Sequence, residues 1–142
     1  MIVDFYHLTA SPLERVLPSI AEKVVAGGER LLVVAEPGVL AGLDEQLWSY
    51  AKDSFLPHGR ERAESQPVFL SPEPVPANGA THIALADGRW REEALGFERT
   101  FYFFDNDARE GARDAWRALK GRPEVEARYW KQDDRGKWVQ GP

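Results

Sequence analysis

The sequence contains no cysteine, which excludes disulfides, thiolate catalysis and cysteine-ligated zinc or iron–sulfur sites. Its apolar runs are short, and none approaches the roughly 20 residues of a membrane-spanning helix. The first residues, MIVDFYHL, lack the basic region and the small-residue cleavage site of a signal peptide. We therefore expect a cytoplasmic protein.

Positive charge is sparse in most of the chain and gathers near its end. The 142 residues include 18 basic and 23 acidic side chains, for a net charge of −5, and half of the basic residues lie after residue 100. A protein with this balance has no general counterion-release drive toward nucleic acid. A local basic site for a small acidic partner is compatible with it. The length and the average composition predict one domain over residues 1–142.

The usual patterns of catalysis and cofactor binding are also missing. His7, His58 and His82 lie far apart, without the spacing of metal ligands, and there is no GxSxG serine motif. The segment Glu36–Gly42 has neither the lysine of a P-loop nor the glycine spacing of a dinucleotide fold. We predict no catalytic residue, no metal and no cofactor. The alternative, a small α/β enzyme or nucleotide-binding protein that uses this loop, rests on fold analogy.

The order of apolar patterns predicts an α/β fold. A β-rich stretch over residues 2–8 is followed by apolar residues at helical spacing, with Ser11 and Glu14 placed as a capping box and Gly27-Gly28 as the helix end. Pro18 should kink this helix or shift its start. Since a buried strand (30–35) and a second helix (37–51) come next, a parallel sheet covered by helices is expected. Further strands are expected at 67–70, 81–86 and 97–104, a helix at 107–120, and a closing hairpin from 124–130 and 137–139.

The helix predicted over residues 107–120 carries a basic ridge. Arg109, Arg113 and Arg117 are spaced at i, i+4 and i+8, so they share one face. Guanidinium groups bind carboxylates in a bidentate manner, and a neighbouring aromatic ring offers an apolar floor. The ridge therefore suits a short acidic peptide with a hydrophobic end. Three aromatic residues could complete the site: Trp116 on the helix, and Tyr102 and Phe104 on the preceding strand.

A simpler interpretation of the ridge is a solvated helix face. Its arginines would then pair with Asp105, Glu110 and Asp114, and the residues alone favour this interpretation. A second group of large side chains has two interpretations as well. Trp48 and Phe55 lie on either side of the end of the predicted helix 37–51, and they serve either as anchors for a partner or as core packing.

The order and spacing of several segments resemble one known family, the chi subunit of bacterial DNA polymerase III. The most specific match is LDEQLW (43–48) continued by SFLPH (54–58). The resemblance covers nearly the whole chain, although the C-terminal segment with Tyr129–Asp134 departs from the best-known members. Supporting segments are VDFYHL (3–8), GERLLV (28–33), QPV (66–68), NG (78–79) and ARDAWR (112–117).

The resemblance implies a non-catalytic α/β protein. It implies a three-layer, Rossmann-like domain with a mostly parallel sheet, helices on both faces and no bound nucleotide. Members link the clamp loader, through the psi subunit, to the acidic, hydrophobic-ended C-terminal tail of single-stranded DNA-binding protein (SSB), so contact with DNA is indirect. By position, Arg113 matches the key tail-binding arginine, Arg109 and Arg117 match basic neighbours, and Trp116 and Tyr102 match apolar positions. Trp48 and Phe55 match positions that bind psi or an alternative helicase partner.

Overall fold

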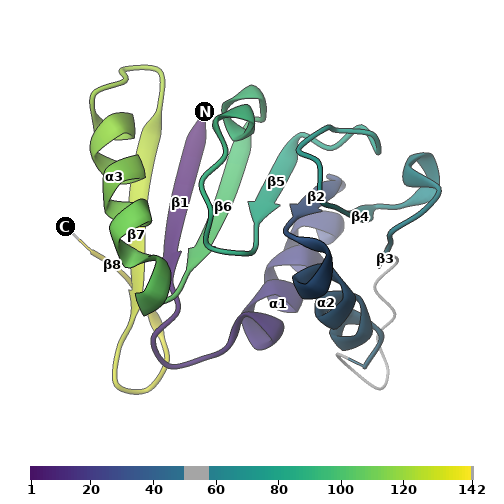
Figure 1. Ribbon diagram of the computed structural model, residues 1–142, viewed down its shortest axis with the longest axis horizontal. Coiled ribbons are helices and arrows are strands. Elements are labelled where there is room, and N and C mark those ends of the chain that lie inside the picture. The colour runs from purple at the N-terminus through teal and green to yellow at the C-terminus, as the bar shows by residue number, and fades with distance from the viewer. Residues whose placement is uncertain (50–57, 142) are drawn as a thin grey trace.

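The computed structural model describes residues 1–49 and 58–141, which form an α/β fold around one eight-stranded sheet (Figure 1). The strand order is β3-β4-β2-β5-β6-β1-β7-β8, and every pairing is parallel except that of β7 with β8. The strands are β1 (Ile2–His7), β2 (Leu31–Val34), β3 (His58–Gly59), β4 (Val68–Ser71), β5 (His82–Leu85), β6 (Arg99–Phe104), β7 (Glu126–Gln132) and β8 (Trp138–Gln140). The helices are α1 (Leu13–Ala26), α2 (Pro37–Ser49) and α3 (Arg109–Lys120), with short 3-10 turns at Ala63–Ser65, Glu92–Gly96 and Asn106–Ala108.

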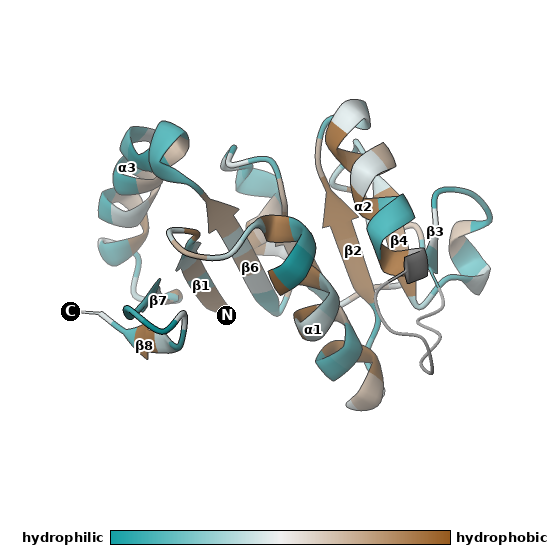
Figure 2. Ribbon diagram, turned by 90° about the horizontal axis from the view of Figure 1, so that it is seen from below, coloured by the Kyte–Doolittle hydropathy of each residue, from teal (hydrophilic) through white to brown (hydrophobic). Residues whose placement is uncertain are grey.

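Alternation along the strands divides the core into two clusters. Successive strand residues point to opposite faces of the sheet, so Leu31 and Val33 pack toward α1 and α2, whereas Leu32 and Val34 pack in the cluster of α3. All four residues of β2 are fully buried, as expected for a parallel strand covered on both faces. Figure 2 shows the consequence for composition, because β2 is brown whereas α3, which is buried along one side only, is mainly teal.

The predicted helices and strands are confirmed over the described residues, but several of their ends differ. Residues 50 and 51, the predicted end of the second helix, lie outside the described residues. The capping box at Ser11 does not form, because Pro12 caps α1 without a side-chain hydrogen bond and the Ser11 hydroxyl instead accepts a hydrogen bond from Gln132. Helix α1 continues through Pro18, so the expected later start is not seen. It ends as predicted, and Gly28 has a φ of 83°, a conformation that favours glycine.

Two features of the sheet were not predicted. No strand was predicted at residues 58–59, but His58 and Gly59 form the short strand β3, which pairs with β4. Strand β7 belongs to the predicted hairpin, but it also pairs in parallel with β1, from Ile2 opposite Glu126 to His7 opposite Lys131. This second pairing matters for the site, because it brings the C-terminal segment beside the first strand and opposite α3.

Candidate functional site

A pocket of about 330 Å³ lies between α3 and the sheet. Its apolar surface comes from rings that contact one another: Phe5 meets Trp116 edge to face at 5.2 Å, and Trp116 meets Tyr129 in the same way at 6.2 Å. Ala112, a small residue of the buried side of α3, leaves room between these rings. The full lining is Phe5, His7, Phe104, Arg109, Ala112, Arg113, Trp116 and Tyr129.

Arg109 and Arg113 border this pocket and are exposed to solvent. In the part of the chain that the structure describes, neither has an acidic partner within 4 Å, and no acidic residue lines the pocket. The expected pairing of the ridge arginines with helix carboxylates occurs only for Arg117, which lies 3.6 Å from Asp114 with both side chains more than 70% exposed. The pairing that the solvated-face interpretation expects is therefore found at one end of the ridge. Arg109 and Arg113 have no such partner among the described residues.

The pocket also has a polar wall opposite the arginines. His7 is held from both sides, since its Nε2 lies 2.8 Å from Asn106 Oδ1 and its Nδ1 lies 2.9 Å from the Tyr129 hydroxyl. Burial raises the pKa of Tyr129, and the positive charges of Arg113 and Arg109 oppose that rise without cancelling it. The phenol therefore stays protonated near neutral pH, and it is close enough to both guanidinium groups to experience their field.

The sequence-predicted ridge is only partly assembled at the pocket. Arg109, Arg113 and Trp116 come together there, but Arg117 is not among the lining residues. Tyr102 lies behind the wall, because it is fully buried and its hydroxyl donates to the Gly88 carbonyl oxygen at 2.8 Å. Its ring instead supports the pocket from behind, packing edge-on against Phe5 at 5.3 Å.

The sequence did not predict four of the lining residues, namely Phe5, His7, Ala112 and Tyr129, whereas Phe104 was noted as a possible neighbour of the ridge. Phe5 and His7 point to the same face of β1, and this alternation is visible in the sequence. What the sequence does not display is that β1 lies between β6 and β7, which is the fact that places Phe5, His7 and Tyr129 opposite α3.

The second predicted site is not described as fully. Trp48 lies in the last turn of α2, and Phe55 lies outside the described residues. The assignment of these two residues to a partner interface therefore remains a prediction.

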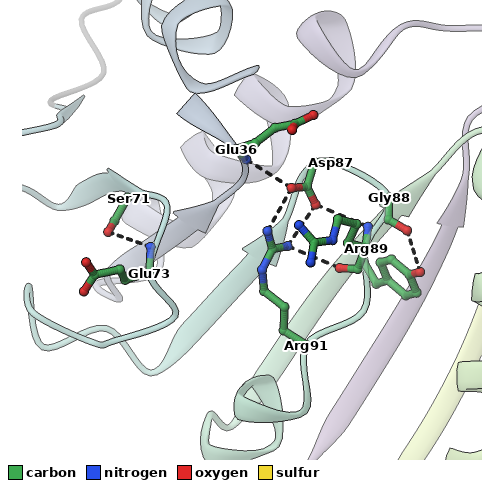
Figure 3. Close-up of polar contacts among 8 residues, drawn as sticks. Glu36, Ser71, Glu73, Asp87, Gly88, Arg89 and Arg91 are labelled. Carbon is green, nitrogen blue, oxygen red and sulfur yellow. Dashed lines mark hydrogen bonds and ion pairs between the residues drawn. The ribbon is translucent and has the colours of Figure 1, made fainter. Parts of the chain in front are cut away.

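The loop Glu36–Gly42, on which the alternative of a nucleotide-binding protein depends, has a carboxylate at the start of its helix. Helix α2 begins at Pro37, and the backbone N–H of Glu36 at its start donates to Asp87 Oδ2 at 3.0 Å (Figure 3). Burial raises the pKa of Asp87, but hydrogen bonds from Arg91 and from backbone amides hold the pKa below its ordinary value. A carboxylate thus occupies the place where a phosphate would meet the helix N-terminus, and it would repel one.

Residues 1–49 and 58–141 contain neither a metal-binding cluster nor a membrane-spanning helix. No group of three or more histidine or acidic side chains there is arranged to hold a metal ion. In the same residues, no helix combines the length and the apolar character needed to cross a membrane.

Comparison with known families decides the family. The model of the DNA polymerase III chi subunit, HolC, matches residues 1–124 of the 142. The chain belongs to this family. Its members are non-catalytic accessory subunits of DNA polymerase III. A search of curated proteins finds no match.

The chi-family match ends before one wall of the pocket is complete. It includes β1, β6 and all of α3, and therefore Phe5, His7, Arg109, Arg113 and Trp116. Strand β7, with Tyr129, and the hairpin strand β8 follow the matched segment. The pocket thus combines a family surface with a wall from the C-terminal segment.

Proposed function

We propose that this chi-family protein is an adaptor that holds the acidic C-terminal tail of SSB in the α3 pocket and so bridges it to the clamp loader. The family assigns it to the polymerase III assembly, and its Rossmann-like, three-layer, single-domain character and its cytoplasmic location are part of the same proposal. DNA is reached only through SSB. The observation that carries the proposal is the pair of exposed arginines, Arg109 and Arg113, which have no acidic partner in the described part of the chain and lie above an aromatic pocket.

The chemistry of the two halves of the pocket matches the two halves of such a tail. Guanidinium groups bind carboxylates in a fork geometry, which an ammonium group cannot reproduce. The rings of Phe5, Phe104 and Trp116 offer apolar surface to a terminal hydrophobic side chain. Lys120 lies over the Trp116 ring at 5.1 Å and adds positive charge at the rim.

The decisive experiment is a titration of a labelled SSB tail peptide into the purified protein. Arg113→Ala should weaken binding by about 2–3 kcal/mol, well over tenfold, because a ligand carboxylate loses its bidentate partner. Arg113→Lys should restore little of the loss. Removing the terminal hydrophobic residue of the peptide should abolish binding even at low salt.

The matched control is Arg15→Ala, which removes an exposed arginine from α1, packed on the other face of the sheet. It makes the same change in net charge as Arg113→Ala and should leave the affinity unchanged. If the two variants bind alike, general electrostatic attraction explains the binding and the pocket has no specific role. If Arg113→Ala and the shortened peptide both behave as wild type, the arginines form only a solvated helix face.

We also propose that Trp48 and Phe55 contact psi or an alternative helicase partner. This part rests on the family positions of the two residues and is independent of the α3 pocket. Trp48→Ala should abolish capture of the partner in a pull-down, with an unchanged melting temperature, because a central aromatic anchor typically contributes about 2–4 kcal/mol. A variant that unfolds instead shows that Trp48 is core packing. The SSB tail titration should be unaffected in either case if the protein is folded.

A further inference from the structure

The α3 pocket is rich in hydrogen-bond donors and poor in acceptors. Arg109 and Arg113 carry only donors, and the indole of Trp116 is also a donor. Phe5, Phe104 and Ala112 have no polar side-chain atom. Among the lining side chains, only His7 and Tyr129 contain an acceptor at all.

The contacts of His7 decide which of the two is available. Asn106 Oδ1 can only accept, so the tautomer that fits this contact carries its hydrogen on His7 Nε2 and donates it across 2.8 Å. His7 Nδ1 is then an acceptor, and the Tyr129 hydroxyl donates its proton to it across 2.9 Å. Both nitrogens of His7 are used, and the proton of Tyr129 is turned away from the ligand. Among residues 1–49 and 58–141, no group donates a hydrogen bond to the Tyr129 oxygen in this arrangement, so its lone pairs can accept one from a ligand.

Packing holds the side chains of His7 and Tyr129 in place. The His7 ring is stacked on Phe104 at 4.8 Å with an interplanar angle of 16°, and only 9% of the residue is exposed. Tyr129 is anchored from its other side by Gly141, whose N–H donates to the Tyr129 carbonyl oxygen at 2.7 Å. A Cβ at Gly141 would lie 2.6 Å from the ring, so a glycine is needed for this close approach. The acceptor is thus held by β1, β6 and the end of the chain together.

A peptide that enters the pocket brings backbone N–H groups as well as carboxylates. An N–H that is buried without an acceptor loses its hydrogen bond to water and is not compensated. We propose that the Tyr129 oxygen, with its proton held by His7, accepts a hydrogen bond from the backbone N–H of the last residue of the bound tail. The inference rests on the proposed function and specifies that the pocket recognises the C-terminal end of the peptide. Tyr129 is a specificity-determining residue in this scheme, and His7 is a positioning residue.

The test replaces the last amide of the tail peptide by an ester, which removes one N–H with almost no change in shape. The loss of one neutral hydrogen bond should weaken wild-type binding about fivefold. Tyr129→Phe, which keeps the ring, should weaken binding of the amide peptide by a similar factor. The ester peptide and Tyr129→Phe together should show no further loss, because both remove the same bond. An ester one bond earlier in the peptide is the control and should affect both proteins equally.

Two protein controls isolate the roles. Tyr6→Phe removes a hydroxyl from the β1 residue that lies between Phe5 and His7 and packs toward the α1 face. It should change neither the affinity nor the effect of the ester. His7→Phe keeps a ring to stack on Phe104 but releases the proton of Tyr129, so the coupling between Tyr129 and the ester should fall even where the melting temperature is preserved. An unchanged coupling in His7→Phe contradicts its positioning role.

The outcomes separate this inference from the proposed function. If Arg113→Ala loses binding while the effects of Tyr129→Phe and of the ester simply multiply, the adaptor function stands and the Tyr129 contact is wrong. If Tyr129→Phe binds as wild type, the contact is wrong as well. If the wild-type protein does not bind the amide peptide, both proposals fall.

Discussion

The arginines on the two faces of the sheet at β1 have opposite surroundings. On the α3 face, Arg109 and Arg113 are exposed beside an aromatic pocket and have no acidic partner among the described residues. On the other face, Arg99 and Arg128 both bind Asp4, which is fully buried. Consecutive residues of one strand, Asp4 and Phe5, thus belong to two different environments.

The Asp4 cluster is saturated. Its carboxylate accepts two hydrogen bonds from Arg99, two from Arg128 and one from the indole of Trp130, at 2.7–3.1 Å. Burial raises the pKa of Asp4, but the hydrogen bonds from Arg128, Trp130 and Arg99 outweigh it, so its pKa lies below the ordinary value. Arginines that already share a carboxylate have little to offer a ligand. The number of arginines therefore does not distinguish the two faces; the presence of a buried carboxylate partner on one of them does.

The largest effect should come from breaking the saturated cluster. Asp4→Asn removes the buried counter-charge that Arg99 and Arg128 share and leaves Arg128 only a 3.9 Å contact with the exposed Glu126. Breaking a fully buried ion pair in this way costs about 3–5 kcal/mol. The side chains of Arg99 and Arg128 are 35% and 26% exposed, so water offsets part of this and we expect about 2–3 kcal/mol. Urea unfolding followed by circular dichroism measures the loss. Asp114→Asn, on the exposed pair with Arg117, is the matched control and should change stability by less than about 0.5 kcal/mol.

Removing an arginine from the α3 face should reduce peptide affinity, whereas removing one from the Asp4 cluster should reduce stability. Arg113→Ala should weaken tail binding well over tenfold and leave unfolding within about 0.5 kcal/mol of wild type. Arg99→Ala should lower stability by about 1–2 kcal/mol, through its lost bonds to Asp4, and leave peptide affinity intact. Parallel melts and titrations of the two variants provide the measurement. Equal effects on both properties would erase the distinction between the faces.

Acid should remove the contribution of the Asp4 cluster to stability. Because the folded pKa of Asp4 is depressed below its unfolded value of about 3.8, its contribution is present above that pH and is lost as the pH falls through the folded pKa. The stability difference between wild type and Asp4→Asn should therefore shrink below about pH 3.8. Unfolding curves between pH 2.5 and 7 test this, and a difference that stays constant to the lowest pH contradicts the assignment.

The smallest effect should be that of salt. The ridge arginines are exposed, so raising the ionic strength should weaken tail binding by a few-fold and leave an apolar remainder. The loss of stability in Asp4→Asn should change little over the same range, since buried pairs are screened less. Titrations and unfolding curves at about 0.05 and 0.5 M NaCl compare the two.

The sequence predicted this contrast only in part. Local patterns located α3 and its ridge of arginines, because helical spacing depends on neighbours within two turns. They did not distinguish Arg113 from Arg117, whose partner Asp114 is also local, nor place Tyr102 behind the wall. Such distinctions depend on which strands are adjacent. Strand β1 meets residues about a hundred positions away, from Arg99 to Lys131, and no local pattern encodes that pairing.

The position of β1 between β6 and β7 also sets an order of assembly during synthesis. The first strand is made first, but both of its partners lie in the last third of the chain (Figure 1). Strand β1 cannot pair on either side until β6 and β7 have been synthesised, and such long-range parallel pairing forms slowly. A nascent chain that has progressed only to the end of α3 lacks Arg128 and Trp130 for Asp4, and also lacks Tyr129 for the pocket. The Asp4 cluster and the wall of the α3 pocket are therefore completed together, when β7 joins the sheet.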